Sequence, residues 1–496
     1  MTNSPNKKGS LYRQLGLVGL AATGICSMLG ASVYVVPIMI QRNVPDIGPY
    51  VLPAFLFAAL PALFAAFAYA SLASAMPRAG GSYIFASRGL HPYLGFVASF
   101  AQWFGLTIVI GVICYVIIPF FRDMAAAMEM EQLAHTLDTG WIRVSLALLL
   151  LWTFVGINMR GLQFYERTLI PLMILMFALG GIVIVTGFSN NHADFADILL
   201  EQNGNTIPQK EVSFSIGTFL AAAAVLFSSF IGFDSIAQAG GEAKNPEKLL
   251  PKAIAIAVLT VGSFYFIFTA AVYHAVPWEY IAQEAQEKDI TAPGLFSYLL
   301  SPAWGLAIIA GAAIALINDL PAMLLSVSRL LFAWAEDGLF SKKIAAVHPA
   351  TQTPIVALFI SGIMATIGIL GSHFAGDFFL GVDIMVTSML VNFILMCLTL
   401  ICIPKKNPAI ALNIKILKSH KWRSSIAWTG FIFLLVFLII HTWKDLQAPV
   451  EKWYFHATPV WLIVMGAASL IYFRQIKKIR QTGIDLDQLF TNLPEE

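Results

Sequence analysis

Long apolar stretches recur along almost the whole chain and are separated by shorter polar segments. Each stretch is long enough to cross the hydrocarbon core of a bilayer, which takes about 20 residues of α-helix. They lie near residues 15–40, 48–76, 90–121, 141–158, 167–188, 213–240, 252–277, 303–335, 354–371, 377–403, 425–442 and 457–474. The pattern predicts an all-α polytopic membrane protein with 12 transmembrane helices.

Two of these apolar stretches, the first and the sixth, are interrupted near their centres. The sixth contains Gly232 and, two residues later, Asp234. A glycine inside a helix costs about 1 kcal/mol, and a carboxylate at the membrane centre costs at least about 2.5 kcal/mol. The first contains a similar stretch of small residues at 24–32. We therefore predict that spans 1 and 6 are broken helices, unwound near residues 26–31 and 231–233.

The positions of the two breaks predict how the spans are related. Backbone leaves helical geometry inside a bilayer only where it lines a cavity or is buried in protein. Interrupted spans in corresponding positions of two halves indicate the binding site of a secondary transporter. Spans 1 and 6 are five apart, an odd number, so the second half enters the membrane in the opposite direction. We expect a 5+5 inverted repeat, spans 1–5 against 6–10, with spans 11 and 12 added outside it.

Lys and Arg residues indicate the orientation of the chain. Most of the 30 fall on tails and loops of one side when both termini are placed in the cytoplasm, as the positive-inside rule requires. We therefore predict a multi-pass protein of the cytoplasmic (inner) membrane with both termini cytoplasmic. The expected segments are a cytoplasmic N-terminal tail (1–14), a ten-helix transport core (15–403), a basic cytoplasmic loop (404–424), two accessory helices (425–474) and a cytoplasmic C-terminal tail (475–496).

Composition agrees with a membrane protein and narrows the choice of partners. Of the 496 residues, 58% are hydrophobic and 12% are charged, whereas soluble domains carry about 25% charged residues. The net charge of +2 gives no reason to expect nucleic acid. The four cysteines lie in apolar segments and form neither a disulfide framework nor a metal-ligand spacing. We expect membrane lipid as a partner, no cofactor and no metal, and the oligomeric state is left open.

Several linear motifs occur in a characteristic order. They are PRAGGSY (77–83) and GLHPYLGF (89–96) after span 2, NMRG (158–161) after span 4, FIGFD (230–234) and EAKNP (242–246) in and after span 6, and AEDGL (335–339) and VHP (347–349) after span 8. Together they resemble the amino acid–polyamine–organocation (APC) transporters over about residues 15–405. The resemblance implies a leucine-transporter-like fold and an amino acid permease whose substrates are amino acids or related amines.

The chain departs from the family pattern at positions that bear on coupling. Cys26 and Ser32 replace two glycines of the first break. Met176 stands where some members carry a lysine near the position of a sodium ion in related transporters. A sodium site of that kind also needs hydroxyls in the middle of span 8, and residues 321–325 have none. Sodium coupling is therefore disfavoured.

The expected substrate site lies between the two breaks. The first N–H groups of the second half of span 1 lack intrahelical partners and, with the helix dipole, suit a substrate carboxylate. The unwound carbonyls of both breaks can accept hydrogen bonds from the substrate ammonium. The expected substrate-binding residues are Ser27, Met28, Gly30, Ala31, Ser32, Ser228, Phe230, Ile231, Gly232 and Met323. The alternative is that the glycines only allow close helix packing.

Two acidic residues inside the spans are candidates for proton coupling or charge selectivity. Asp234 directly follows the break in span 6, so it can cap the second half-helix, and it can also take up a proton during transport. Asp319 lies one turn before Met323 on the same face of span 8. A carboxylate there suits a basic substrate side chain or a proton. The alternative for Asp319 is a buried residue bonded to Asn318 or to a neighbouring helix.

Other classes of function fit the sequence less well. We expect no enzyme, because the nine histidines lie mostly in loops and at span ends and show no metal-ligand spacing. A channel needs rings of like groups around a continuous pore, whereas two facing breaks suggest an occluding site. We therefore expect a secondary active transporter that works by alternating access, as a proton-coupled symporter or an exchanger. An amino acid or amine antiporter without proton coupling is the alternative.

Overall fold

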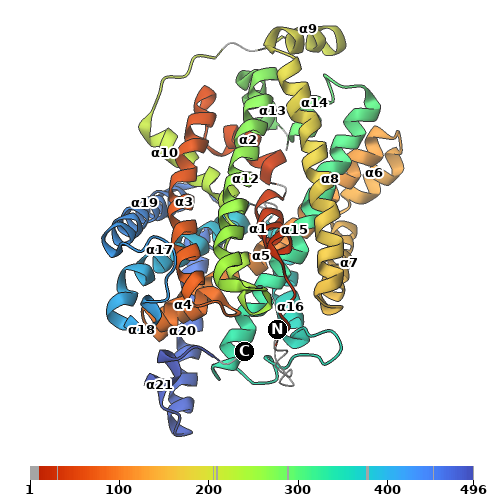
Figure 1. The fold of residues 1–496 in the computed structure, drawn as a ribbon. Helices are drawn as coiled ribbons and strands as arrows, with labels where there is room; N and C mark the ends of the chain where they lie inside the picture. The colour runs from red at the N-terminus through yellow and green to blue at the C-terminus, as the bar shows by residue number, and fades with distance from the viewer. Residues whose placement is uncertain are drawn as a thin grey trace.

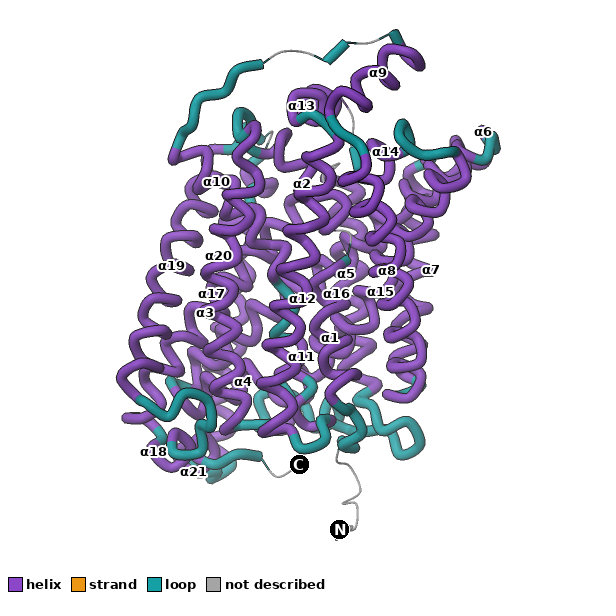
Figure 2. The backbone as a smooth tube through the Cα atoms, turned by 45° about the horizontal axis from the view of Figure 1, so that its top comes forward, coloured by secondary structure: helices purple, strands orange, loops and turns teal. Residues whose placement is uncertain are grey.

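A computed structural model describes residues 11–30, 32–204, 206–207, 210–287, 290–375, 379–450 and 452–494 of the chain. Figure 1 shows a bundle of long helices, and the tube in Figure 2 shows no strand in the described ranges. Twelve helical segments are long and apolar enough to span a membrane. The predicted all-α architecture with 12 spans is therefore confirmed.

The spans consist of the following helices. Span 1 is α1 (Leu17–Leu29) with α2 (Ser32–Asn43), span 2 is α3 (Val51–Ala75), span 3 is α5 (Pro92–Ala127), span 4 is α7 (Gly140–Met159), span 5 is α8 (Leu162–Ser189), and span 6 is α10 (Ile216–Leu226), η2 (Phe227–Phe230) and α11 (Ser235–Gln238). Span 7 is α12 (Pro246–Ala275), span 8 is α15 (Pro302–Glu336), span 9 is α16 (Ile355–Ala375), span 10 is α17 (Phe379–Lys406), span 11 is α19 (His420–Gln447) and span 12 is α20 (Ala457–Gln481).

Short helices cover the two ends of the bundle (Figure 1). Near the end where α1 begins and α20 ends, which we call the terminal face, lie α4 (Gly81–Gly89), η3 (Gly240–Glu242), α18 (Pro408–Ala411) and α21 (Leu486–Thr491). At the opposite face lie η1 (Gly48–Tyr50), α6 (Glu131–Asp138), α9 (His192–Asn203), α13 (Trp278–Glu287), α14 (Ala292–Phe296) and η4 (Trp453–Phe455). In the described ranges, no separate soluble domain is attached to the bundle.

Several helices extend beyond the boundaries expected from hydropathy. α12 begins at Pro246 rather than near residue 252, and α19 begins at His420, inside the segment expected as a loop. α20 continues to Gln481 and α21 follows it, so part of the segment expected as the C-terminal tail is helical. Hydropathy marks only the apolar part of a helix, and residues such as Lys, Arg and Gln continue the helix well because they are good helix formers.

Packing within the first ten spans follows the expected repeat. In a 5+5 repeat, each of spans 1–5 corresponds to the span five places later. If two spans are in contact, the two spans that correspond to them should also be in contact. Three pairs consist of two corresponding spans, and the two helices of each pair are in contact: α3 with α12, α5 with α15, and α7 with α16. The contact of α5 with α17 corresponds to a contact of α15 with α8, and both are present. α19 and α20 pack outside this core, mainly on α17.

Candidate functional site

The two predicted breaks are present and contact each other. α1 ends at Leu29 and α2 begins at Ser32, while the backbone of span 6 is extended at Ile231, with φ −79° and ψ 131°. Gly232 has a φ of +136°, and a Cβ placed on it would lie 2.2 Å from the Ser27 carbonyl oxygen. Only glycine meets both requirements, because L side chains rarely adopt this backbone conformation. This close approach joins the two broken spans.

The break in span 1 is narrower than expected. Residues 26–29 were expected to be unwound but are the last turn of α1. Their carbonyls still lack intrahelical partners, because the last four carbonyls of any helix do. The Met28 carbonyl accepts a hydrogen bond from the Tyr265 hydroxyl at 3.1 Å. The Ser27 hydroxyl lies 2.9 Å from that of Ser235, which adds a side-chain contact between the two breaks.

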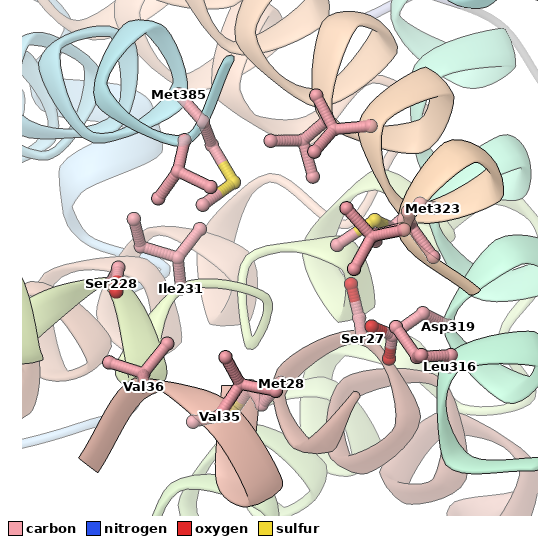
Figure 3. A pocket seen from close by; sticks show the side chains of 15 residues that line it. Ser27, Met28, Val35, Val36, Ser228, Ile231, Leu316, Asp319, Met323 and Met385 are labelled. Carbon is pink, nitrogen blue, oxygen red and sulfur yellow. The ribbon is translucent and has the colours of Figure 1, made fainter. Parts of the chain in front are cut away.

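A cavity of about 90 Å³ lies beside the breaks (Figure 3). Its walls are mainly aliphatic and come from α1, α2, α5, α15, α17 and the break in span 6. The lining residues are Ser27, Met28, Val35, Val36, Val109, Val112, Ile113, Val116, Ser228, Ile231, Leu316, Asp319, Met323, Val382 and Met385. Pockets that bind small molecules are mostly apolar with a few placed polar groups, and this cavity has that character.

The cavity brings together about half of the expected substrate-binding residues. Ser27, Met28, Ser228, Ile231 and Met323 line it. Gly30 and Gly232 lie behind the lining, against Asp319 and the Ser27 carbonyl. Ala31 and the side chain of Ser32 lie outside the described part of the chain.

Phe230 differs from its expected place. Its ring does not line the cavity but packs beside the ring of Phe55, with ring centroids 5.1 Å apart, and near that of Tyr265. In the short 3₁₀ turn η2, Ser228 faces the cavity while the Phe230 side chain turns toward α3 and α12. Phe230 therefore supports the site from behind.

Sequence reasoning missed most of the aliphatic wall. The missed residues are Val35, Val36, Val109, Val112, Ile113, Val116, Leu316, Val382 and Met385. α5 supplies four of them at the spacing of one helix face. Since α5 is apolar on all sides, nothing in a single sequence distinguishes this face from the others.

Asp319 reaches the cavity from α15. Its side chain is buried, and its carboxylate accepts a hydrogen bond from the Gly30 backbone N–H. A Cβ placed on Gly30 would lie 1.5 Å from Asp319 Oδ2, so only glycine allows this approach. Within the described residues, Oδ1 has no hydrogen-bond partner. The neighbouring Asn318 donates instead to Cys26 Sγ at 3.0 Å, so Asp319 is not bonded to Asn318. Its bond to Gly30 of span 1 agrees with the other form of the alternative, a buried Asp319 bonded to a neighbouring helix.

Asp234 is fully buried but does not line the cavity. Its carboxylate accepts hydrogen bonds from the Gly232 backbone N–H at 3.1 Å and from the Gln102 side chain. It makes no capping hydrogen bond to α11, so the expected cap is wrong. The reason is local geometry, because Asp234 has helical φ and ψ of −62° and −26°, whereas a capping residue is usually extended. Its side chain points back to the break.

A buried polar network continues from Asp234 toward the terminal face. Gln238 donates to Gln102 Oε1 at 3.2 Å and to Ser82 Oγ at 2.7 Å. The Ser82 hydroxyl lies 2.6 Å from the Tyr69 hydroxyl, which also accepts from Asn392. Five helices are thereby linked to the break in span 6. The sequence carries a signal for this network, since amides such as Gln102 and Asn392 are costly within apolar spans, but it does not show which of them meet.

Ion pairs close the bundle between the breaks and the terminal face. The buried Arg329 of α15 pairs with the buried Glu242 of η3. The Glu242 carbonyl accepts from the backbone N–H groups of Gln14 and Leu15, both at 2.9 Å. A second buried pair joins Arg88 of α4 to Asp337 at 2.5 Å. The cavity lies on the other side of these contacts.

The fold and the site define a polytopic helical membrane protein built around two broken spans. The family model described as Amino acid permease matches residues 15–468. The chain belongs to this family.

Curated proteins with similar sequences are named as transporters, permeases and importers. The chain is 29% identical to Cationic amino acid transporter 4 of Mus musculus over 374 residues, which cover 72% of the chain and 54% of that protein. It is 26% identical to the Branched-chain amino acid permease BcaP of Bacillus subtilis over 80% of the chain and 82% of that protein. It is 23% identical to the Low-affinity putrescine importer PlaP of Escherichia coli over 68% of the chain and 69% of that protein. The chain spans about half the length of the cationic amino acid transporters that it matches.

Proposed function

We propose that this protein is a secondary active transporter of amino acids or related amines that works by alternating access. The observation that carries the proposal is the cavity between two broken helices that touch through Gly232 and the Ser27 carbonyl. Broken helices near the centre of a membrane protein supply unpaired backbone groups to a bound substrate. The proposed membrane is the cytoplasmic one, with both termini cytoplasmic, because the basic residues are concentrated on that side.

The position of the cavity supports access from one side. Its lining extends along α5 from Val109 to Val116 and includes Val382 near the start of α17, so it reaches toward the opposite face. On the terminal side, Arg329 with Glu242 and the polar network of Asp234 close the bundle. A transporter needs a second state in which these contacts open and the other side closes. The ion pairs and the joined breaks are the parts that must rearrange.

Asp234 is the proposed proton carrier if transport is proton-linked. It is the acidic residue directly at the break, and it accepts from the Gly232 N–H and from Gln102. Protonation removes the negative charge that holds these two donors, so it would loosen the break and the network together. Exchange of internal for external substrate, without proton coupling, is the second candidate, because the same contacts could respond to substrate alone.

Sodium is not the proposed coupling ion. Met176 of α8 is buried, and its side chain offers neither an oxygen nor a charge. Residues 321–325 of α15 are Pro, Ala, Met, Leu and Leu, which carry no side-chain oxygen. Sodium prefers oxygen ligands, as other hard cations do.

The three relatives described above support a substrate with an amino group. Their names refer to cationic amino acids, branched-chain amino acids and putrescine. A protonated amine is the feature that these compounds share. Carbonyls in the last turn of α1, which lack intrahelical partners, can accept hydrogen bonds from such a group.

Uptake into proteoliposomes tests the proposed function. The purified protein is reconstituted, and uptake of a labelled amino acid or amine is compared with and without a pH gradient, with and without internal substrate, and with sodium replaced by choline. We expect uptake that survives the loss of sodium and responds to the pH gradient or to internal substrate. Absence of uptake under all these conditions, or strict sodium dependence, would contradict the proposal.

A further inference from the structure

The carboxylate of Asp319 lies against Gly30, directly at the break in span 1. The N–H groups at the start of a half-helix attract negative charge because they lack intrahelical partners. Just before α2 begins at Ser32, the N–H of Gly30 is bonded to the Asp319 carboxylate, so a negative charge of the protein already lies at this break. Asp319 Oδ2 also fills the space that a side chain on Gly30 would take, only 1.5 Å from the position of a Cβ.

A substrate carboxylate would therefore meet a carboxylate of the protein. Two carboxylates that share one site repel each other, and one of them must take up a proton. No Lys, Arg or His side chain is among the described residues that line the cavity. The lining thus offers a second carboxylate no positive partner.

A cation fits the same place well. Asp319 is the only ionisable side chain in the lining, and within the described residues its Oδ1 has no hydrogen-bond partner. A buried carboxylate without an opposite charge beside it is costly in free energy. A protonated amine would supply both that opposite charge and hydrogen-bond donors. Ser27 lies beside Asp319 in the cavity and adds a hydroxyl near the same point (Figure 3).

The rest of the cavity suits an aliphatic body. Val35, Val36, Ile231 and Met385 separate Asp319 from Ser228, which lies across the cavity (Figure 3). The Ser228 hydroxyl is buried and has no hydrogen-bond partner in the described ranges. The site therefore has one charged end, one hydroxyl end and aliphatic walls between them.

We propose that this cavity binds an organic cation with a protonated amine and no carboxylate, and that Asp319 is its counter-charge. The inference rests on the proposed function and narrows its substrate class from amino acids or amines to amines. It assigns the role of the substrate carboxylate to a side chain of the protein. Asp319 is then the residue that favours an amine over the amino acid that differs from it only by a carboxylate.

Paired ligands that differ only by a carboxylate test the inference. Binding to the purified wild-type protein is measured by calorimetry for leucine against 3-methylbutylamine and for lysine against 1,5-diaminopentane. We expect each amine to bind at least tenfold more tightly than its amino acid. Equal or tighter binding of the amino acids would overturn the inference and leave the proposed function standing. Failure of all four compounds to bind or to enter proteoliposomes would overturn both.

Variants of Asp319 test the same point in a second way. Asp319→Asn keeps the size but removes the charge, so binding of 3-methylbutylamine should weaken at least tenfold. Asp319→Ala also frees the Gly30 N–H, so the preference within each pair should fall or reverse. Asp383→Asn is the matched control, because this carboxylate of α17 lies outside the cavity lining and near His441. Amine preference that is unchanged in the folded Asp319 variants would overturn the inference, and the wild-type comparison tests it even if these variants fail to fold.

Discussion

Single glycines hold the two broken spans in contact. Gly232 combines a φ of +136° with an approach of the Ser27 carbonyl that excludes any Cβ. At Gly30, the carboxylate of Asp319 likewise leaves no room for a Cβ. The sequence identifies both positions as breaks, because glycine is unfavourable inside a helix. It does not show what approaches them, since the partners lie about 200 and 290 residues away along the chain.

Gly232→Ala should disrupt the contact between the breaks. The added Cβ would meet the Ser27 carbonyl, and a non-glycine residue at such a φ costs about 1–3 kcal/mol. We expect a lower midpoint of thermal unfolding in detergent together with loss of substrate binding. Gly181→Ala is the control, because nothing lies within 4 Å of a Cβ at this position of α8. Unchanged stability and binding in Gly232→Ala would show that the breaks do not depend on this contact.

Asp234→Asn should separate exchange from accumulation. Asn can still accept from the Gly232 N–H, but it cannot take up and release a proton. In reconstituted vesicles we expect exchange of internal for external substrate to continue, while accumulation driven by a pH gradient is lost. Asp383→Asn, which removes a carboxylate far along α17 from the network, should keep both. Accumulation at the wild-type rate in Asp234→Asn would remove Asp234 as the proton carrier.

The chemistry of the site was predictable only where polar groups interrupt apolar sequence. Asp234 and Asp319 stand out because acids are rare and costly inside spans. Val112 and Val382 carry no such signal, since one aliphatic residue in a span resembles the next. Their place in the cavity depends on how α5 and α17 pack.

At the scale of elements, the second and eighth spans are continuous while the first and sixth are broken. The position of each break followed from its small residues, but its width did not. α1 stays helical to Leu29, because ordinary helix formers such as Met28 and Leu29 continue the turn once Tyr265 satisfies a terminal carbonyl. The helix that opposes the break, α15, contains Pro321 and still runs unbroken from Pro302 to Glu336.

The closure on the terminal side depends on an ion pair between two elements. Arg329 of α15 and Glu242 of η3 are both buried, so removing one partner leaves an uncompensated charge and costs about 3–5 kcal/mol. We expect Arg329→Met and Glu242→Gln each to lower the thermal unfolding midpoint strongly. The double variant should recover much of the loss, because no buried charge is left.

Additive losses in that double variant would contradict this account of the pair. Lys415 with Glu247 provides a matched comparison, because both side chains are about half exposed. Exposed pairs contribute about 0–1 kcal/mol. Lys415→Met should therefore change the unfolding midpoint little.

The whole molecule was the most predictable scale. Twelve apolar segments, two breaks five spans apart and a family-like order of motifs are all visible in the chain itself. The structure adds the exchange of contacts between the halves, such as α5 with α17 and α15 with α8. It also shows that residues 489 and 492, after α20, contact the bundle, since Arg88 donates to the carbonyls of Leu489 and Asn492. Those contacts join a side chain to backbone carbonyls about 400 positions away, which hydropathy cannot reveal.

The central claim is that the cavity between the breaks is the substrate site, and substrate protection of a single cysteine tests it most directly. Ser228→Cys places a thiol in the lining with little change in size, in a background where the partly exposed Cys402 is Ala. The rate of modification by a small methanethiosulfonate reagent is measured with and without a saturating concentration of the transported compound. Ser301→Cys, at an exposed position before α15, serves as the control.

We predict that the transported compound slows modification at position 228 at least tenfold and leaves position 301 unaffected. Equal rates at position 228 with and without that compound would show that the substrate binds elsewhere.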